Sequence, residues 1–234
     1  MMKYAFTAVC AVWLGLVPMA QAQDTDAVVV ELFTSQGCVS CPPADALLGQ
    51  LSTDSRVIAL SLHVDYWDYL GWKDKFASPK FTARQKEYAH HARDKTIYTP
   101  QIVVQGQARV VGSKADDVEA AILAQIGKNH ATGLQIWRSG DVVSIRAEPV
   151  SGLEGPIRVQ LVRYIPTESV LIERGENAGK TITYHNVVNS WQLLEKWNGS
   201  SPLAIDAQAP GTSPVVVILQ ADGPAAILGA AVLR

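Results

Sequence analysis

The segment Ala27–Leu51, AVVVELFTSQGCVSCPPADALLGQL, decides the fold of this chain. Its first seven residues form a nearly continuous apolar run rich in β-branched side chains, which is typical of a strand buried on both faces of a parallel sheet. From Ala44 to Leu51 apolar residues recur at i, i+3, i+4 and i+7, and Pro42 and Pro43 fall in the first turn, where a helix tolerates proline. The segment therefore predicts a strand, a turn and an amphipathic helix, with two cysteines where the helix begins.

The same alternation of strands and helices continues to about residue 131. The expected elements are a strand at 57–64, a helix from Pro79 to about Asp94 capped by Ser78, a hairpin of strands 102–104 and 108–111, and a helix introduced by a capping box of Ser113 and Asp116. Alternating strands and helices imply right-handed parallel crossovers, and the later hairpin adds an antiparallel edge. The sequence thus predicts an α/β domain, a mixed sheet with flanking helices.

The pattern changes after residue 131. Strand-like runs occupy residues 133–145, 156–165, 214–220 and 226–233, and helix signals are sparse. We expect a mostly antiparallel β-rich C-terminal region, either a small sandwich or an extension packed on the first domain. The segment Gly175–Lys180 is predicted to be a loop between strands, and the absence of a flanking strand and helix argues against phosphate binding there.

The N-terminus has the pattern of a secretory signal peptide. Lys3 precedes an apolar stretch that ends at the small-residue triplet Ala20-Gln21-Ala22, after which the chain becomes polar. The apolar stretch is shorter than the ~20 residues that a membrane-spanning helix needs. We therefore expect a signal peptide at residues 1–22, a first domain at 23–131 and a β-rich domain at 132–234. The mature protein would be exported, periplasmic or secreted, with no attachment to the membrane.

Composition excludes several classes of protein. The chain has 234 residues, 48% of them hydrophobic, and a formal charge of -2 from 20 basic and 22 acidic residues. That composition is typical of a globular protein, and the lack of a basic excess argues against nucleic acid as a partner. Only three cysteines are present, so a scaffold stapled by disulfides is excluded. Removal of the signal peptide takes Cys10 and leaves Cys38 and Cys41.

Cys38 and Cys41 form a C-x-x-C motif at the predicted start of a helix. Helix N-termini present unpaired N–H groups and the positive end of the dipole, and both stabilise a thiolate. Cys38, at the edge of the turn, is the expected nucleophile, and Cys41, in the first turn, is the expected resolving thiol. The pair needs no cofactor for thiol–disulfide exchange, and its partners would be protein or small-molecule thiols and disulfides.

Other interpretations of the cysteine pair remain open. A purely structural disulfide would close a loop too short to add much entropic stabilisation. A zinc site needs about two further ligands, and no second C-x-x-C is present. His63, at the end of the second predicted strand, could complete a copper(I) site with Cys38 and Cys41, since this soft ion suits thiolates. A binding protein without catalytic activity is a third possibility.

The residues around Pro100 connect the C-x-x-C motif to a known superfamily. Thr99-Pro100 precedes a predicted strand, a hairpin and a helix, and together with Glu31–Cys41 this arrangement resembles the thioredoxin-like superfamily. The resemblance implies a thioredoxin-like mixed sheet, a cis-proline at Pro100 that faces the cysteines, and an extended substrate held by Thr99 and Pro100. It also implies that Cys38 attacks and Cys41 resolves.

A wider resemblance spans nearly all of the expected mature chain. It rests on residues 29–47, on His63–Asp74, HVDYWDYLGWKD, and on Arg174–Lys180, RGENAGK. These motifs are similar to those of a family of secreted bacterial thioredoxin-like proteins of unknown function. The family implies the fold and the compartment, but it supplies neither a substrate nor the direction of electron flow.

Two further features each allow two interpretations. Glu31, seven residues before Cys38, either faces inward as a proton acceptor for Cys41 or faces away from it. The aromatic segment Tyr66–Phe76 either walls a substrate groove near the ends of the strands or packs as a second small core under a long connection.

Overall fold

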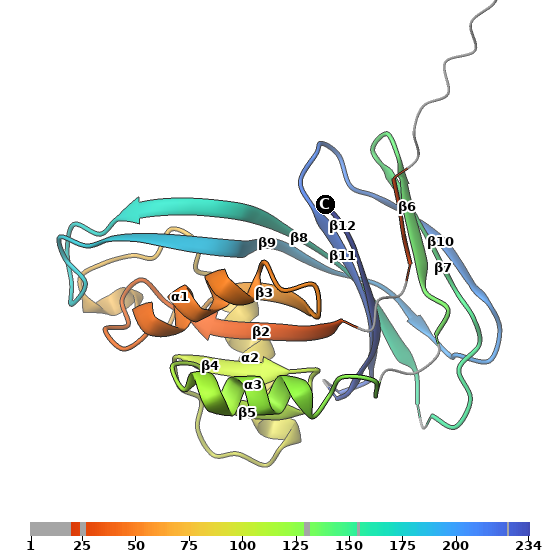
Figure 1. The fold of residues 1–234 in the computed structure, drawn as a ribbon, viewed down its shortest axis with the longest axis horizontal. Helices are drawn as coiled ribbons and strands as arrows, with labels where there is room; N and C mark the ends of the chain where they lie inside the picture. The colour runs from red at the N-terminus through yellow and green to blue at the C-terminus, as the bar shows by residue number, and fades with distance from the viewer. Residues whose placement is uncertain (1–19, 24–26, 129–131, 154, 224) are drawn as a thin grey trace, which may run out of the picture.

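The computed structural model describes residues 20–23, 27–128, 132–153, 155–223 and 225–234 (Figure 1). The helices are α1 (Pro42–Leu51), α2 (Pro79–His91) and α3 (Ala115–Leu123), with a 3₁₀ turn, η1, at Asp68–Leu70. The strands are β1 (Ala20–Gln23), β2 (Val28–Thr34), β3 (Val57–His63), β4 (Gln101–Val104), β5 (Ala108–Val111), β6 (Gln135–Ser139), β7 (Val142–Ala147), β8 (Ile157–Leu171), β9 (Thr181–Trp197), β10 (Leu203–Gln208), β11 (Val215–Ala221) and β12 (Ile227–Leu233).

Eight strands form one mixed sheet in the order β12-β11-β8-β9-β3-β2-β4-β5. β2 and β3 pair in parallel from Val28↔Val57 to Thr34↔His63, whereas β4 is antiparallel to β2 and forms a hairpin with β5. All residues of β2 and β3 are buried, as expected for strands covered on both faces. The predicted mixed α/β architecture with a β-rich C-terminal region is confirmed.

The two faces of β2 and β3 are covered by different helices. Val28, Val30 and Leu32 pack with α1 and α3 in one core, while Val29 and Phe33 pack with α2 in another. Figure 1 shows α1 in front of the sheet and α2, drawn fainter, behind it. Successive side chains of a strand point to opposite faces. The even-numbered residues of β2 therefore face α1 and α3, and the odd-numbered residues face α2.

The β-rich region both extends the first sheet and forms a second layer. β8 and β9 make a long antiparallel hairpin, and β9 joins β3 in parallel through Ser61↔Val187. A separate four-stranded sheet, β1-β6-β7-β10, shares a hydrophobic core with β8, β11 and β12. Strands from both sides of residue 131 therefore lie in one sheet, and the division into two domains at that point stays a prediction.

Helix boundaries test the capping predictions. Ser78 caps α2 as predicted, because its side chain accepts a hydrogen bond from the Lys80 backbone N–H. The capping box at Ser113 is wrong: Lys114 is the N-cap of α3, and no side chain caps that end. The reason is a backbone turn, Lys114 N–H to Val111 O at 3.0 Å, which places Ser113 before the cap. α2 ends at His91, three residues earlier than expected.

The apolar stretch expected to be a signal peptide lies mostly in residues 1–19, outside the described residues. Ala20–Gln23 form β1, which pairs with β6. No helix within the described residues has the length and apolar character needed to cross a membrane.

Glu31 lies on the α2 face of the sheet and is paired there. Arg84 of α2 donates to both of its carboxylate oxygens at 2.6 and 3.0 Å, and the Tyr88 hydroxyl donates to one of them at 2.5 Å. The Arg84 guanidinium also stacks on the Trp191 ring of β9, 3.9 Å from its centroid. This buried ion pair ties β2, α2 and the β8–β9 hairpin together.

Replacing Glu31 by Gln is expected to lower the free energy of unfolding by about 3–5 kcal/mol, because Arg84 would stay buried without its counter-charge. Urea unfolding of the oxidised protein measures this change. As a control, Glu119→Gln removes the exposed contact to Arg56 and should change stability little, since solvent screens such pairs. Equal effects of the two substitutions would contradict the importance of the buried pair.

Candidate functional site

Cys38 and Cys41 form a disulfide at the start of α1, with their Cα atoms 5.4 Å apart. Cys41 is the N-cap residue, and its carbonyl oxygen accepts the first hydrogen bonds of the helix, from the N–H groups of Ala44 and Asp45. The Cys41 N–H donates to the Cys38 carbonyl at 3.2 Å. The predicted setting of the pair, between a buried strand and a helix N-terminus, is therefore present.

Both cysteines are buried, at 1% and 0% exposure. Sequence placed Cys38 at an edge, yet it is no more exposed than Cys41, whereas the two residues between them, Val39 and Ser40, are exposed. The Ser40 hydroxyl lies 3.4 Å from the Cys38 sulfur. Pro42 and Pro43, which follow Cys41, lack a backbone N–H. The Ser40 hydroxyl is therefore a nearby donor that can take the place of these missing N–H groups.

Pro100 lies near the first turn of α1. The Thr99-Pro100 peptide bond is cis, as the resemblance implied. A Cβ built on Gly112 would lie 3.2 Å from the Cβ of Ala44 and 3.3 Å from the Cβ of Pro100, so Gly112 separates Pro100 from α1. The Thr99 hydroxyl accepts a 2.8 Å hydrogen bond from the Trp67 indole N–H. A site that joins Thr99 and Pro100 to the two cysteines stays a prediction.

The aromatic segment Tyr66–Phe76 packs mainly inward. The Trp67 Cβ lies against Gly37, and the Trp72 indole donates to the Gln36 side-chain oxygen at 2.8 Å. Trp72 and Phe76 join a small cluster with residues of β8 and β9, as the second interpretation predicted, whereas Tyr66 and Trp67 pack against the core on the α2 face. Tyr69, at 80% exposure, is the member that projects into solvent.

The turn from Ser35 to Cys41, which we call the cysteine loop, is also held by the β-rich region. Asn177, only 1% exposed, donates from its side-chain amide to the carbonyl oxygens of Gln36 at 2.9 Å and Cys38 at 3.0 Å. Residues 172–180, the hairpin tip, connect β8 to β9 (Figure 1). The loop prediction for Gly175–Lys180 is confirmed, but its contact with the cysteines was missed, because nothing in the sequence pairs residues some 140 positions apart.

A buried polar cluster lies on the α1 face of the sheet near Cys41. His63 Nδ1 contacts an oxygen of Asp74 at 2.6 Å, and the Tyr184 ring packs on the His63 ring with centroids 4.9 Å apart. Asp45, four residues after Cys41, accepts a hydrogen bond from Thr34 at 2.8 Å. Burial raises the pKa of Asp45 to about 7, against opposing effects of His63 and Thr34.

Among the residues that the structure describes, three polar atoms of this cluster have no hydrogen-bond partner: Asp45 Oδ2, His63 Nε2 and the Tyr184 hydroxyl. Buried groups of this kind are normally satisfied, so three of them in one cluster are unusual. Glu31, by contrast, points to the opposite face of the sheet, which settles the two interpretations of that residue. For Asp45, the only signal in the sequence was its position four residues after Cys41, a spacing that places two residues on the same side of a helix.

The described residues do not provide the ligand set that the copper(I) hypothesis needs. Within the described residues, no three His, Cys, Asp or Glu side chains are grouped in a way that could hold a metal ion. His63 uses Nδ1 for Asp74, and the two cysteines are bonded to each other.

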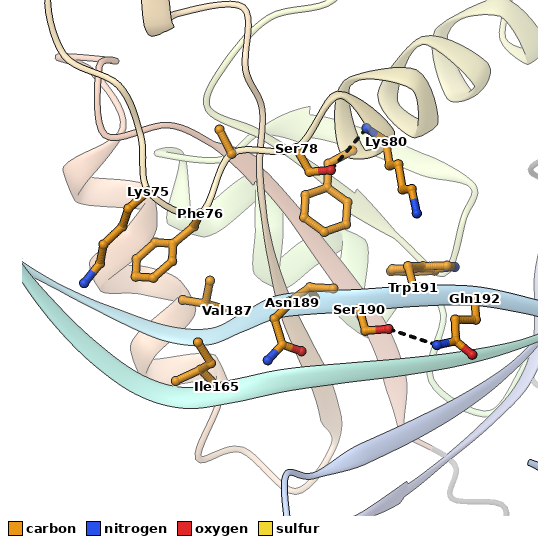
Figure 2. Close-up of a pocket in the computed structure, with 13 residues that line it drawn as sticks. Lys75, Phe76, Ser78, Lys80, Ile165, Val187, Asn189, Ser190, Trp191 and Gln192 are labelled. Atoms are coloured by element: carbon orange, nitrogen blue, oxygen red, sulfur yellow. Dashed lines mark hydrogen bonds between the residues drawn. The ribbon is translucent and has the colours of Figure 1, made fainter. Parts of the chain in front are cut away.

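A separate cavity of about 550 Å³ opens between the start of α2 and the β8–β9 hairpin (Figure 2). Its lining includes Lys75, Phe76, Lys80 and Trp191, and none of the cysteines or Thr99 and Pro100 takes part. Phe76 forms the wall toward the buried polar cluster, since its ring packs on His63 at 5.1 Å. This cavity is therefore distinct from the surroundings of the disulfide.

The chain resembles known proteins over most of its length. A family described as "Protein of unknown function (DUF1223)" matches residues 29–220. The chain belongs to this family. The matched region contains the cysteine loop, Pro100, the buried polar cluster and Asn177, so the family spans both the first sheet and the hairpin tip.

Two solved structures resemble the fold of this chain. The crystal structure of protein AGR_C_4864 from Agrobacterium tumefaciens is 34% identical, with a TM-score of 0.75 over 88% of this chain and 93% of that one. HBP35 of Porphyromonas gingivalis is 13% identical, with a TM-score of 0.62 over 88% and 74% of the two chains, and shows a shared fold alone. No match was found among curated proteins.

Asp45 makes stability depend on pH. A carboxyl whose pKa is raised on folding binds its proton more tightly in the native state, so the free energy of unfolding should fall between about pH 4 and pH 7 and then level off. Asp45→Asn removes this dependence. Across that interval the free energy of unfolding of the variant should rise relative to that of the wild type, by at most about 4 kcal/mol at pH 8.

Urea unfolding at a series of pH values measures the difference between the two proteins. Asp116→Asn, which changes an exposed carboxylate in the first turn of α3, serves as the control and should show no comparable trend. A constant difference between wild type and Asp45→Asn from pH 4 to pH 8 would contradict the raised pKa.

Proposed function

We propose that this protein is an exported thiol–disulfide oxidoreductase of thioredoxin-like architecture, in which Cys38 attacks and Cys41 resolves. The observation that carries the proposal is a disulfide that closes onto the N-cap residue of α1, with the cis-proline Pro100 near the first turn of the same helix. The parallel β2–α1–β3 unit and the β4–β5 hairpin support the architecture. The signal-peptide pattern at residues 1–22 supports export.

The reaction proceeds by two exchanges. The Cys38 thiolate attacks one sulfur of a substrate disulfide, forming a mixed disulfide and breaking the substrate S–S bond, and the departing thiolate takes a proton from solvent. Cys41 then attacks the Cys38 sulfur, which releases the second substrate thiolate and leaves the Cys38–Cys41 disulfide. The substrate gains two electrons that the cysteine pair loses. The same steps in reverse oxidise a dithiol.

Side chains around the pair supply what each step needs. Ser40 donates a hydrogen bond to the Cys38 thiolate, because its hydroxyl is already 3.4 Å from that sulfur. Asp45, on the same side of α1 as Cys41, takes the proton of Cys41 before the second exchange and returns it after reduction. An open groove of about 920 Å³ between α1 and β9 begins at Pro42 and offers a substrate chain a path to the pair.

Trapping tests the roles of the cysteines. In Cys41→Ala the mixed disulfide on Cys38 cannot be resolved, so it should accumulate when the reduced protein meets oxidised glutathione or a peptide disulfide. Mass spectrometry under non-reducing conditions measures the adduct. Cys38→Ala is the matched control and should form far less adduct. Equal adducts on both variants, or none on either, would overturn the assignment of Cys38 as the nucleophile.

Ser40→Ala tests the hydroxyl as a donor to the thiolate. Hydrogen bonds to charged groups contribute about 1.5–3 kcal/mol, and a partly solvated one lies at the low end. The midpoint pH for alkylation of Cys38 should therefore rise by about one unit, measured with the reduced protein in a Cys41→Ala background. Val39→Ala, which alters the other exposed residue between the cysteines, should leave the midpoint in place. A similar shift in both variants would contradict a specific role of Ser40.

A further inference from the structure

Asn177 is placed to act on the cysteine loop from a distant part of the chain. One amide group, buried to 1% exposure, donates to two carbonyl oxygens that flank Gly37, those of Gln36 and Cys38. With both oxygens turned toward the same amide, the peptide groups between them are fixed. The direction in which the Cys38 side chain leaves the backbone is then fixed as well.

The hairpin tip holds this amide in one orientation. Lys180 donates to the Asn177 side-chain oxygen at 2.9 Å, so the nitrogen must face the cysteine loop. The N–H groups of Ile172 and Gly179 bond across the tip to Lys180 and Ile172, and Gly175, at φ +78°, leaves room for the Trp72 Cβ. β8 and β9 pair from Leu171↔Thr181 onward, which anchors the tip in the large sheet.

The disulfide and Asn177 restrain the same part of the backbone. In the oxidised protein the bond to Cys41 holds Cys38 at the start of α1, in the position in which its carbonyl accepts a hydrogen bond from Asn177. Reduction breaks the covalent bond, and a loop without Asn177 can then relax and expose its carbonyls to water, whereas the disulfide-bonded loop would keep them buried without this donor. Loss of Asn177 should therefore cost more stability in the oxidised state than in the reduced state.

We infer that Asn177 is a positioning residue for Cys38 and that the hairpin tip is a functional wall of the cysteine site, which gives the β-rich half of the chain a role in the redox reaction. This inference rests on the proposed function. Its consequence is that the β8–β9 hairpin sets the redox equilibrium of the pair: by stabilising the oxidised form, in which Cys38 is held in place for the bond to Cys41, Asn177 makes the disulfide a weaker oxidant.

Asn177→Ala tests the inference in the full-length protein, equilibrated with glutathione buffers of increasing oxidised fraction. The reduced and oxidised forms are separated by the mass added on alkylation of free thiols. We expect the equilibrium constant to shift toward the reduced dithiol by about tenfold, the change that corresponds to 1.4 kcal/mol of selective stabilisation. A purely structural role would lower the stability of both forms alike and leave this equilibrium unchanged.

Two controls are available on the same hairpin. Leu171→Ala removes an exposed side chain at the end of β8 and should not move the equilibrium. Lys180→Met releases the Asn177 oxygen but keeps the amide donor, so its shift should be smaller than that of Asn177→Ala. Wild-type exchange with an unmoved equilibrium in Asn177→Ala would overturn this inference alone. A wild-type disulfide that does not exchange with glutathione would overturn the proposed function and the inference with it.

Discussion

The backbone of the cysteine loop depends on hydrogen bonds from side chains that lie far away in the sequence. Asp74 accepts the Gln36 N–H at 2.8 Å, and Asn177 donates to the carbonyls of Gln36 and Cys38. Buried backbone groups need such partners, and the loop supplies part of them itself, through bonds from the Cys38 and Cys41 N–H groups to the Ser35 and Cys38 carbonyls. The aromatic segment and the hairpin tip supply the others, from two sides of the loop, and so help to hold the disulfide at the start of α1.

Because side chains alternate along a strand, the buried polar groups of β2 and β3 lie on two different faces of the large sheet. Glu31 falls on the α2 face, where Arg84 neutralises it, while Thr34 and His63 fall on the α1 face near Cys41. The first group holds the fold together as a satisfied ion pair. The second group includes Asp45 and, within the described part of the chain, polar atoms that have no hydrogen-bond partner. This difference is the reason why the proposed reaction assigns the proton of Cys41 to Asp45 and not to Glu31.

The sequence predicted the local features and missed the distant ones. Apolar periodicity located β2, α1, β3 and the β4–β5 hairpin, because those signals are contained within a few residues. It could not show that β8 and β9 extend the same sheet, since strand pairing over more than a hundred residues leaves no local pattern. The cysteine pair at the start of α1 and the cis peptide at Pro100 agree with the prediction, while a site that joins them stays a prediction. Asn177 and Asp45 were missed because their importance depends on what packs against them.

The proposed function requires that the Cys38–Cys41 disulfide exchanges reversibly with thiols instead of only bracing the loop. This can be measured by titrating the wild-type folded protein with dithiothreitol redox buffers, with the redox state followed by thiol alkylation and the fold by circular dichroism. We expect a reversible two-electron transition between oxidised and reduced forms that both remain folded. A disulfide that stays intact until the protein unfolds would contradict it.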